Sequence, residues 1–309
     1  MKTWFIFTLL FLQFNFVAHS SKNNKPNFIL VFCDDLGYAD IGPFGAKGHS
    51  TPALDTMAKE GMKLTDFYST CPVCTPSRAS LMTGCYPRRV NMHVDENNLC
   101  VLFPGAKKGL NPNEITVAEI LKKHGYATKC IGKWHLGDHP KFMPTNHGFD
   151  SYYGIPYSND MNRKEIPLPL VRDLKVVADS VQRDETITEK YTTEAVNFIK
   201  ENSKNPFFLY LPLTSPHTPI VPSKKWQGKS PLGPYGDFVM ETDWVVGQVM
   251  QELAEQKVTE DTVLVFTTDN GCSPAAGIPK LISQGHKPNG DWRGHKADIY
   301  EGGHRVPFL

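Results

Sequence analysis

The segment Cys74-Thr75-Pro76-Ser77-Arg78 places a thiol and a guanidinium group at the start of a predicted helix. Thr75 is a suitable N-cap, and Pro76 suits the first helical position. In one interpretation, Cys74 is a half-buried structural thiol. In the other, Cys74 lies at a helix N-terminus, where backbone N–H groups favour an anion and Arg78 adds a forked cationic donor. The five residues alone do not decide between these interpretations.

A second set of residues offers only oxygen ligands, namely Asp34, Asp35, Asp269 and Asn270. Adjacent carboxylates repel one another unless a cation lies between them. Oxygen ligands without histidine or cysteine favour Ca²⁺ or Mg²⁺ over Zn²⁺. Taken singly, however, the Asp-Asp pair and the Asp-Asn-Gly segment could be an ordinary turn and a helix cap.

Cations and proton-transfer groups follow in Lys133, His135 and His217, together with Arg78. Beside a divalent metal they would form a pocket for a tetrahedral dianion or its monoester, with histidine as general acid or base. An isolated histidine is more often packed or capping than catalytic, but His135 and His217 each follow a predicted strand. Lys296, near the Glu-Gly-Gly turn at 301–303, would by itself be a surface charge.

The elements that must position these residues are four short apolar runs, at 27–33, 127–132, 207–213 and 262–268. Such runs are typical of parallel strands covered on both faces. Helical patterns alternate with them at 50–60, 116–124, 186–201 and 236–256. The alternation predicts a doubly wound α/β fold, with a largely parallel sheet flanked by helices. We expect the polar, proline-containing stretch 155–185 to be a surface excursion.

All four predicted strands are followed by the polar residues described above. In open α/β sheets the ligand site lies beyond the carboxyl ends of the strands. Polar residues after all four strands, at one edge of the sheet, therefore favour a functional site over four solvent-exposed loops that happen to be polar.

The composition narrows the class of protein further. The 33 basic and 32 acidic residues give a net charge of +1, which argues against nucleic acid as a partner. The apolar run after Lys2 ends in Ala18-His19-Ser20 and predicts a signal peptide over residues 1–20. The run is short and interrupted by polar residues, so it disfavours a membrane anchor. Seven cysteines fit an exported protein in an oxidising compartment, whether periplasmic, secreted or lysosomal, although their pairing cannot be read.

Seven motifs in order resemble the sulfatases of the alkaline phosphatase superfamily, in particular the arylsulfatase A and N-acetylgalactosamine-6-sulfatase type. They are PNFILVFCDDLGYAD, CTPSRASLMTG, GYATKCIGKWHLG, HGFDSYYG, PFFLYLPLTSPHTP, VFTTDNG and GHKADIYEGGHRVP. Among them, CTPSR is the most specific, because Cys-x-Pro-Ser-Arg is the family's signal for oxidation of the cysteine to formylglycine.

The resemblance implies hydrolysis of a sulfate ester, on a sulfated carbohydrate or an aryl sulfate. It implies that a formylglycine-generating enzyme converts Cys74, whose hydrated aldehyde then supplies the nucleophilic oxygen. The implied ligands of a Ca²⁺ or Mg²⁺ ion are Asp34, Asp35, Cys74, Asp269 and Asn270. Arg78 would steady the hydrate and the metal site, and Lys133 and Lys296 would bind sulfate oxygens. His217 would assist the leaving group, and His135 would take the hydrate proton to regenerate the aldehyde.

Two departures from the family pattern affect these expectations. Relatives usually have Leu-Thr-Gly-Arg where this chain has Met82-Thr83-Gly84-Cys85, which weakens the expected recognition by the maturing enzyme. Relatives are also longer and carry a smaller C-terminal subdomain, so we expect residues 21–309 to be a C-terminally truncated catalytic domain. Two alternatives stay open: a phosphodiesterase or phosphonate hydrolase on the same scaffold, and a non-catalytic protein that binds sulfated glycans with Cys74 unconverted.

Overall fold

The computed structural model describes residues 25–161 and 167–309, so the predicted signal peptide lies outside the described residues. The strands are β1 (Asn27–Cys33), β2 (Ala127–Lys133), β3 (Ser151–Ile155), β4 (Leu170–Arg172), β5 (Lys175–Ala178), β6 (Phe207–Pro212) and β7 (Thr262–Thr268). The α-helices are α1 (Pro52–Glu60), α2 (Cys74–Thr83), α3 (Val117–Lys123), α4 (Ile187–Asn202), α5 (Pro234–Glu255), α6 (Ile278–Ser283) and α7 (Glu301–His304).

The strands form one sheet in the order β5-β4-β3-β2-β6-β1-β7. The five strands β3, β2, β6, β1 and β7 are neighbours in that order, and each pair of neighbours is parallel. β4 and β5 are added in antiparallel pairing at the edge beside β3. The central strands are apolar along most of their length because helices cover both faces of the sheet. The predicted doubly wound, largely parallel α/β fold is confirmed.

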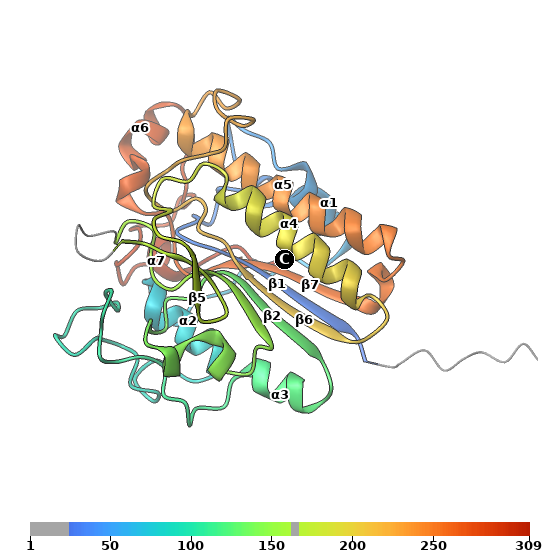
Figure 1. The fold of residues 1–309 in the computed structure, drawn as a ribbon. Coiled ribbons are helices and arrows are strands. Elements are labelled where there is room, and N and C mark those ends of the chain that lie inside the picture. The colour runs from blue at the N-terminus through green and yellow to red at the C-terminus, as the bar shows by residue number, and fades with distance from the viewer. Residues whose placement is uncertain (1–24, 162–166) are drawn as a thin grey trace, which may run out of the picture.

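Two helical layers enclose the sheet. Figure 1 shows α1, α4 and α5 on one face, and α2 and α3 on the other. Helix α4 buries Tyr191, Ala195 and Ile199, which recur every four residues and therefore lie on one side of the helix. Under α2 and α3, the rings of Trp134, Phe149 and Tyr210 belong to a second buried cluster. Each layer thus has its own hydrophobic core, and the sheet lies between them.

The four strands predicted from apolar runs agree with β1, β2, β6 and β7 to within one residue at each end. The prediction for 155–185 is wrong in part, because β4 and β5 form a hairpin within it that extends the sheet. Leu168 and Leu170 are buried there, while Val176 is exposed. β4 has only three residues and β5 buries none of its four, which is why the sequence shows no buried-strand pattern here.

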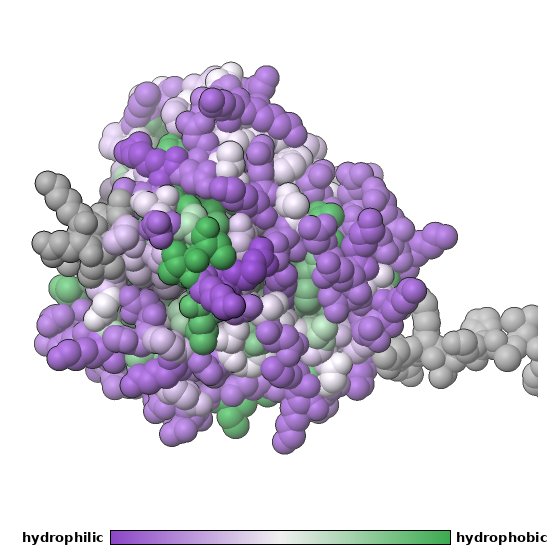
Figure 2. Space-filling view, viewed as in Figure 1, coloured by the Kyte–Doolittle hydropathy of each residue, from purple (hydrophilic) through white to green (hydrophobic). Residues whose placement is uncertain are grey.

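The end of the described chain lies beside β7, where Leu309 is buried and exchanges two backbone hydrogen bonds with Phe266. Figure 2 shows that hydrophilic residues cover most of the face formed by α4 and α5. Among the described residues, no helix is both long enough and apolar enough to cross a membrane.

Candidate active site

Polar segments meet at the carboxyl edge of the sheet. Strands β2, β6, β1 and β7 lie side by side and run parallel, so the residues that follow them leave the sheet at the same edge. Backbone hydrogen bonds join these segments. The N–H of Asp34 donates to Ser215 O at 3.1 Å, and the N–H of Asp269 donates to Cys33 O at 3.3 Å.

Three buried carboxylates, from Asp34, Asp35 and Asp269, form the centre of this region. Asp35 has a left-handed φ of 64°, and its N–H donates to Asp269 Oδ1 at 3.1 Å. Ligand atoms of Asp34, Cys74 and Asp269 lie within 4.8 Å of one another, and so do those of Asp34, Asp35 and His217. Buried negative charges this close together require facing cations.

Each carboxylate faces at least one cation. Lys133 Nζ lies 2.6 Å from Asp34 Oδ2, and Lys296 Nζ lies 2.6 Å from Asp35 Oδ1. Arg78 donates from Nη2 and Nε to Asp269 Oδ2, at 2.8 and 3.2 Å. Because Arg78 and Lys133 are 0% exposed, these charge-assisted bonds form away from water, where they are strong.

The surrounding charges shift the pKa values of two carboxyl groups in opposite directions. Burial and the negative charge of Asp34 raise the pKa of Asp269 to about 7. Burial also opposes ionisation of Asp34, but Lys133 and the other nearby cations hold the pKa of Asp34 well below its usual range. A further cation at this point would favour the ionised form of Asp269.

The donor set fits a hard divalent cation. Asp34 Oδ1 and Asn270 Oδ1 are buried and have no hydrogen-bond partner among the described residues. Arg78 Nη2 lies 3.5 Å from Asp34 Oδ1. Asn270 is held by its amide, which donates from Nδ2 to Asp35 Oδ1 at 2.8 Å. Buried oxygens without partners are costly, and Ca²⁺ or Mg²⁺ would satisfy them.

Cys74 is the first residue of α2, and its N-cap is Val73 in an extended conformation. The prediction that Thr75 caps this helix is therefore wrong. Thr75 is buried inside the first turn, where its hydroxyl accepts from the N–H of Leu102 at 3.1 Å. Pro76 removes no helical hydrogen bond in this turn, because the backbone N–H groups of the first turn have no partner within the helix. Burial raises the pKa of the Cys74 thiol, against the opposing effect of the lysines, so the unmodified thiol stays neutral.

The two predicted histidines are held by backbone carbonyls. His135 Nε2 donates to Leu102 O at 2.9 Å, and burial together with Lys133 keeps the pKa of His135 well below its usual range. His217 Nδ1 donates to Thr218 O at 2.5 Å. The free ring nitrogen, His217 Nε2, then lies 3.4 Å from Asp35 Oδ2.

A cavity of about 630 Å³ opens over Cys74, and its wall includes Ser158, His217 and Lys296. Ser158 is buried and accepts from Lys133 Nζ at 3.1 Å. The sequence analysis missed Ser158, although a signal exists. Ser158 comes shortly after β3, which runs parallel to β2 and delivers its following residues to the same edge.

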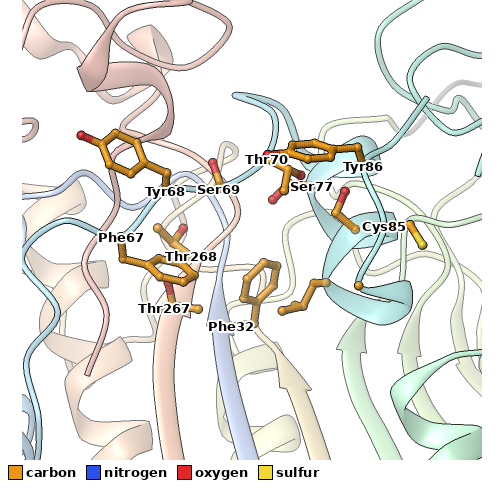
Figure 3. A pocket seen from close by; sticks show the side chains of 13 residues that line it. Phe32, Phe67, Tyr68, Ser69, Thr70, Ser77, Cys85, Tyr86, Thr267 and Thr268 are labelled. Atoms are coloured by element: carbon orange, nitrogen blue, oxygen red, sulfur yellow. The ribbon is translucent and has the colours of Figure 1, made fainter. Parts of the chain in front are cut away.

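A second pocket, of about 300 Å³, lies on another side of α2, next to the ends of β1 and β7. Figure 3 shows the rings of Phe32, Phe67 and Tyr86 around it. Among the described residues its wall contains no carboxylate, lysine, arginine or histidine, in contrast to the cavity over Cys74.

Comparisons with known proteins agree with this geometry. A family model described as Sulfatase matches residues 26–309. N-acetylgalactosamine-6-sulfatase of Canis lupus familiaris is 36% identical over 316 residues, covering 97% of this chain and 60% of the relative. Human arylsulfatase A is 36% identical over 308 residues, covering 92% of this chain and 58% of the relative. The chain therefore spans about 60% of the length of these curated relatives.

Among solved structures, Ps i-CgsB in complex with k-i-k-neocarrahexaose has a TM-score of 0.80 and 32% sequence identity. The match covers 92% of this chain and 65% of that chain.

Proposed function

The chain belongs to the sulfatase family, and we propose that it hydrolyses a sulfate ester, on a sulfated carbohydrate or an aryl sulfate. The observation that carries the proposal is the position of Cys74, which begins α2 next to Asp34 and Asp269. Two lysines also act electrostatically on its thiol. Together these groups make a small, strongly charged site suited to a tetrahedral anion.

Formylglycine, made from Cys74, is the proposed nucleophile. The neutral, buried thiol of the unmodified residue is a weak nucleophile. The hydrated aldehyde would supply an oxygen nucleophile instead, and covalent catalysis divides one difficult displacement into two easier steps.

The proposed metal is Ca²⁺ or Mg²⁺. Its ligands would be Asp34, Asp35, Asp269, Asn270 and the converted residue 74. The two buried oxygens without partners, on Asp34 and Asn270, support this assignment. When bound, the ion would oppose the negative charge that develops on the sulfuryl oxygens.

The remaining roles follow from the contacts of each side chain. Lys133 and Lys296 would bind sulfate oxygens, and Lys296 lines the cavity over Cys74. Arg78 would steady the hydrate and the metal site, because its guanidinium group holds Asp269. His217 would give a proton to the leaving oxygen from Nε2, because its other ring nitrogen, Nδ1, is hydrogen-bonded to Thr218 O. His135, whose low pKa keeps its imidazole neutral, would accept the hydrate proton.

We further propose that residues 1–20 direct export, and that a formylglycine-generating enzyme is the maturation partner. The compartment would be periplasmic, secreted or lysosomal. The described residues from 25 onward carry every proposed catalytic and metal-binding group.

Peptide mass and sulfate release by the full-length protein test the proposal together. Conversion of Cys74 lowers the mass of the 71–88 peptide by about 18 Da, whereas ordinary oxidations of a thiol add oxygen and raise it. Against a panel of sulfated sugars and aryl sulfates, we expect wild type to release sulfate. Cys74→Ala should release none while keeping its melting temperature.

Other outcomes identify the alternatives. An unconverted Cys74 in a protein that still binds sulfated sugars would favour a non-catalytic binding protein. Cleavage of phosphodiesters or phosphonates without sulfate release would favour a phosphodiesterase.

A further inference from the structure

A buried polar cluster lies behind the candidate active site and has no role in the proposed mechanism. It joins Asp40, Tyr235, Cys272 and His286, none of which is more than 3% exposed. The four residues come from the loop after β1, the first turn of α5, the loop after β7 and the segment after α6. Four segments that are far apart in the sequence therefore meet around one buried carboxylate, that of Asp40.

Asp40 is the centre of this cluster and uses all of its oxygens. Its Oδ1 lies 2.7 Å from His286 Nε2. Its Oδ2 accepts from the N–H of Gly37 at 2.6 Å and from the hydroxyl of Tyr235. Its backbone oxygen accepts from His49 Nε2 at 2.6 Å. A buried carboxylate with this many donors holds the segments around it in fixed positions.

One line of contacts runs from Asp40 to the carboxylates of the site. Gly37 lies two residues after Asp35, and a Cβ at Gly37 would meet Pro288 O at 2.4 Å. The N–H of Ala39 donates to the same Pro288 oxygen at 2.7 Å. The segment that follows Asp34 and Asp35 is therefore packed, backbone against backbone, on the segment that carries His286.

A second line runs from Asp40 to the other half of the site. The Tyr235 hydroxyl, which bonds Asp40, also lies 3.3 Å from Cys272 Sγ. The backbone oxygen of Cys272 accepts from the N–H of Lys296 at 3.0 Å, and Asn270 lies two residues before Cys272. Asp40 thus connects the segment of Asp35 with the segments of Asn270 and Lys296.

We propose that Asp40 is a positioning residue that fixes the spacing between these two halves of the metal site. The inference rests on the proposed Ca²⁺ or Mg²⁺ ion and extends it, because Asp40 neither belongs to the proposed ligand set nor lines the cavity over Cys74. Metal affinity depends on such supporting contacts, since they hold the ligands at their required distances.

The test is titration of Ca²⁺ into metal-depleted full-length protein by calorimetry, with thermal unfolding measured in parallel. Asp40→Asn is expected to weaken Ca²⁺ binding by about tenfold or more. The matched control is Asp237→Asn, on the same helix as Tyr235. Asp237 is also a buried carboxylate, and it accepts from the N–H groups of Gly228 and Ser230 at 2.8 and 2.6 Å. We expect this control to lower the melting temperature and to leave the Kd for Ca²⁺ unchanged.

The inference is overturned if Asp40→Asn keeps the wild-type Kd, or if both variants lose Ca²⁺ affinity equally. If Asp40→Asn does not fold, Tyr235→Phe removes one donor to Asp40 and should still raise the Kd. Tyr191→Phe, which removes a buried hydroxyl from α4, then serves as its control. A wild type that binds Ca²⁺ but releases no sulfate contradicts only the proposed function, whereas one that binds neither Ca²⁺ nor Mg²⁺ overturns both.

Discussion

Replacing Arg78 with methionine should destabilise the protein strongly, and by an amount that depends on metal. Arg78 is fully buried, bonds Asp269 twice and donates from Nη1 to the backbone oxygen of Lys133 at 3.0 Å. Removing one partner of a buried ion pair costs about 3–5 kcal/mol. At about 2 °C per kcal/mol for a chain of this size, the melting temperature should fall by about 6–10 °C.

The dependence on metal follows from shared partners. Arg78 and the proposed Ca²⁺ ion neutralise the same two carboxylates, Asp34 and Asp269. Groups that share partners are commonly coupled by about 0.5–3 kcal/mol. Ca²⁺ should therefore raise the melting temperature of Arg78→Met by more than it raises that of wild type.

Differential scanning calorimetry, in a chelator and in excess Ca²⁺, measures both effects. The control is Lys287→Met, because Lys287 pairs with Asp291 at 2.7 Å while the two side chains are 59% and 91% exposed. An exposed pair of this kind contributes about 1 kcal/mol or less. Equal effects of Ca²⁺ on wild type and Arg78→Met would refute the argument. So would a loss in Arg78→Met no larger than that in the control.

Three further predictions concern the metal, the maturation and the acid stability of the protein. Elemental analysis of purified protein should find about one Ca²⁺ or Mg²⁺ per chain; stoichiometric zinc without either ion would contradict the ligand assignment. Cys85→Arg, which restores the usual residue of the family, should raise the converted fraction of Cys74 in the peptide mass; an unchanged fraction would show that this position does not matter. The hydrogen bond from Arg172, against burial and with help from Lys129, lowers the pKa of Glu194 to about 2. Because this folded-state pKa is depressed, the stabilisation by Glu194 is complete above its usual pKa of 4.5 and is lost as the pH falls towards 2. The free energy of unfolding, measured in urea, should therefore fall less steeply over that pH range in Glu194→Gln than in wild type.

Much of the fold could be predicted because parallel strands buried on both faces leave a strong signal. β1 and β6 are apolar runs that are largely buried, and the polar residues after them mark the sheet edge. The hairpin of β4 and β5 could not be predicted, since β4 has only three residues and β5 buries none of its four. The start of α2 differs from the prediction because threonine commonly caps helices, whereas Thr75 lies inside the first turn. Its hydroxyl there accepts from the N–H of Leu102, a contact that the local sequence does not reveal.

The cluster around Asp40 shows a different limit of the sequence. Asp40 lies in an Asp-rich motif, but its partners Tyr235 and His286 are 195 and 246 residues away along the chain. No local periodicity encodes pairings of that length. They become visible only when the sheet order brings the ends of β1 and β7 together.

The strand order also explains why cations and carboxylates occupy different strand ends. β1 and β7 are neighbours, so short side chains suffice there, and the N–H of Asp35 reaches Asp269 Oδ1 at 3.1 Å. β2 is separated from β1 by β6, a distance of about 10 Å between backbones at the usual strand spacing. Only a long side chain closes that gap, and Lys133 Nζ does so at 2.6 Å from Asp34 Oδ2. The carboxylates therefore come from the adjacent strands β1 and β7, while the cations reach them from β2, from α2 and from the loop of Lys296. A shorter residue at position 133, even a positively charged one, would leave Asp34 buried without its nearest cation.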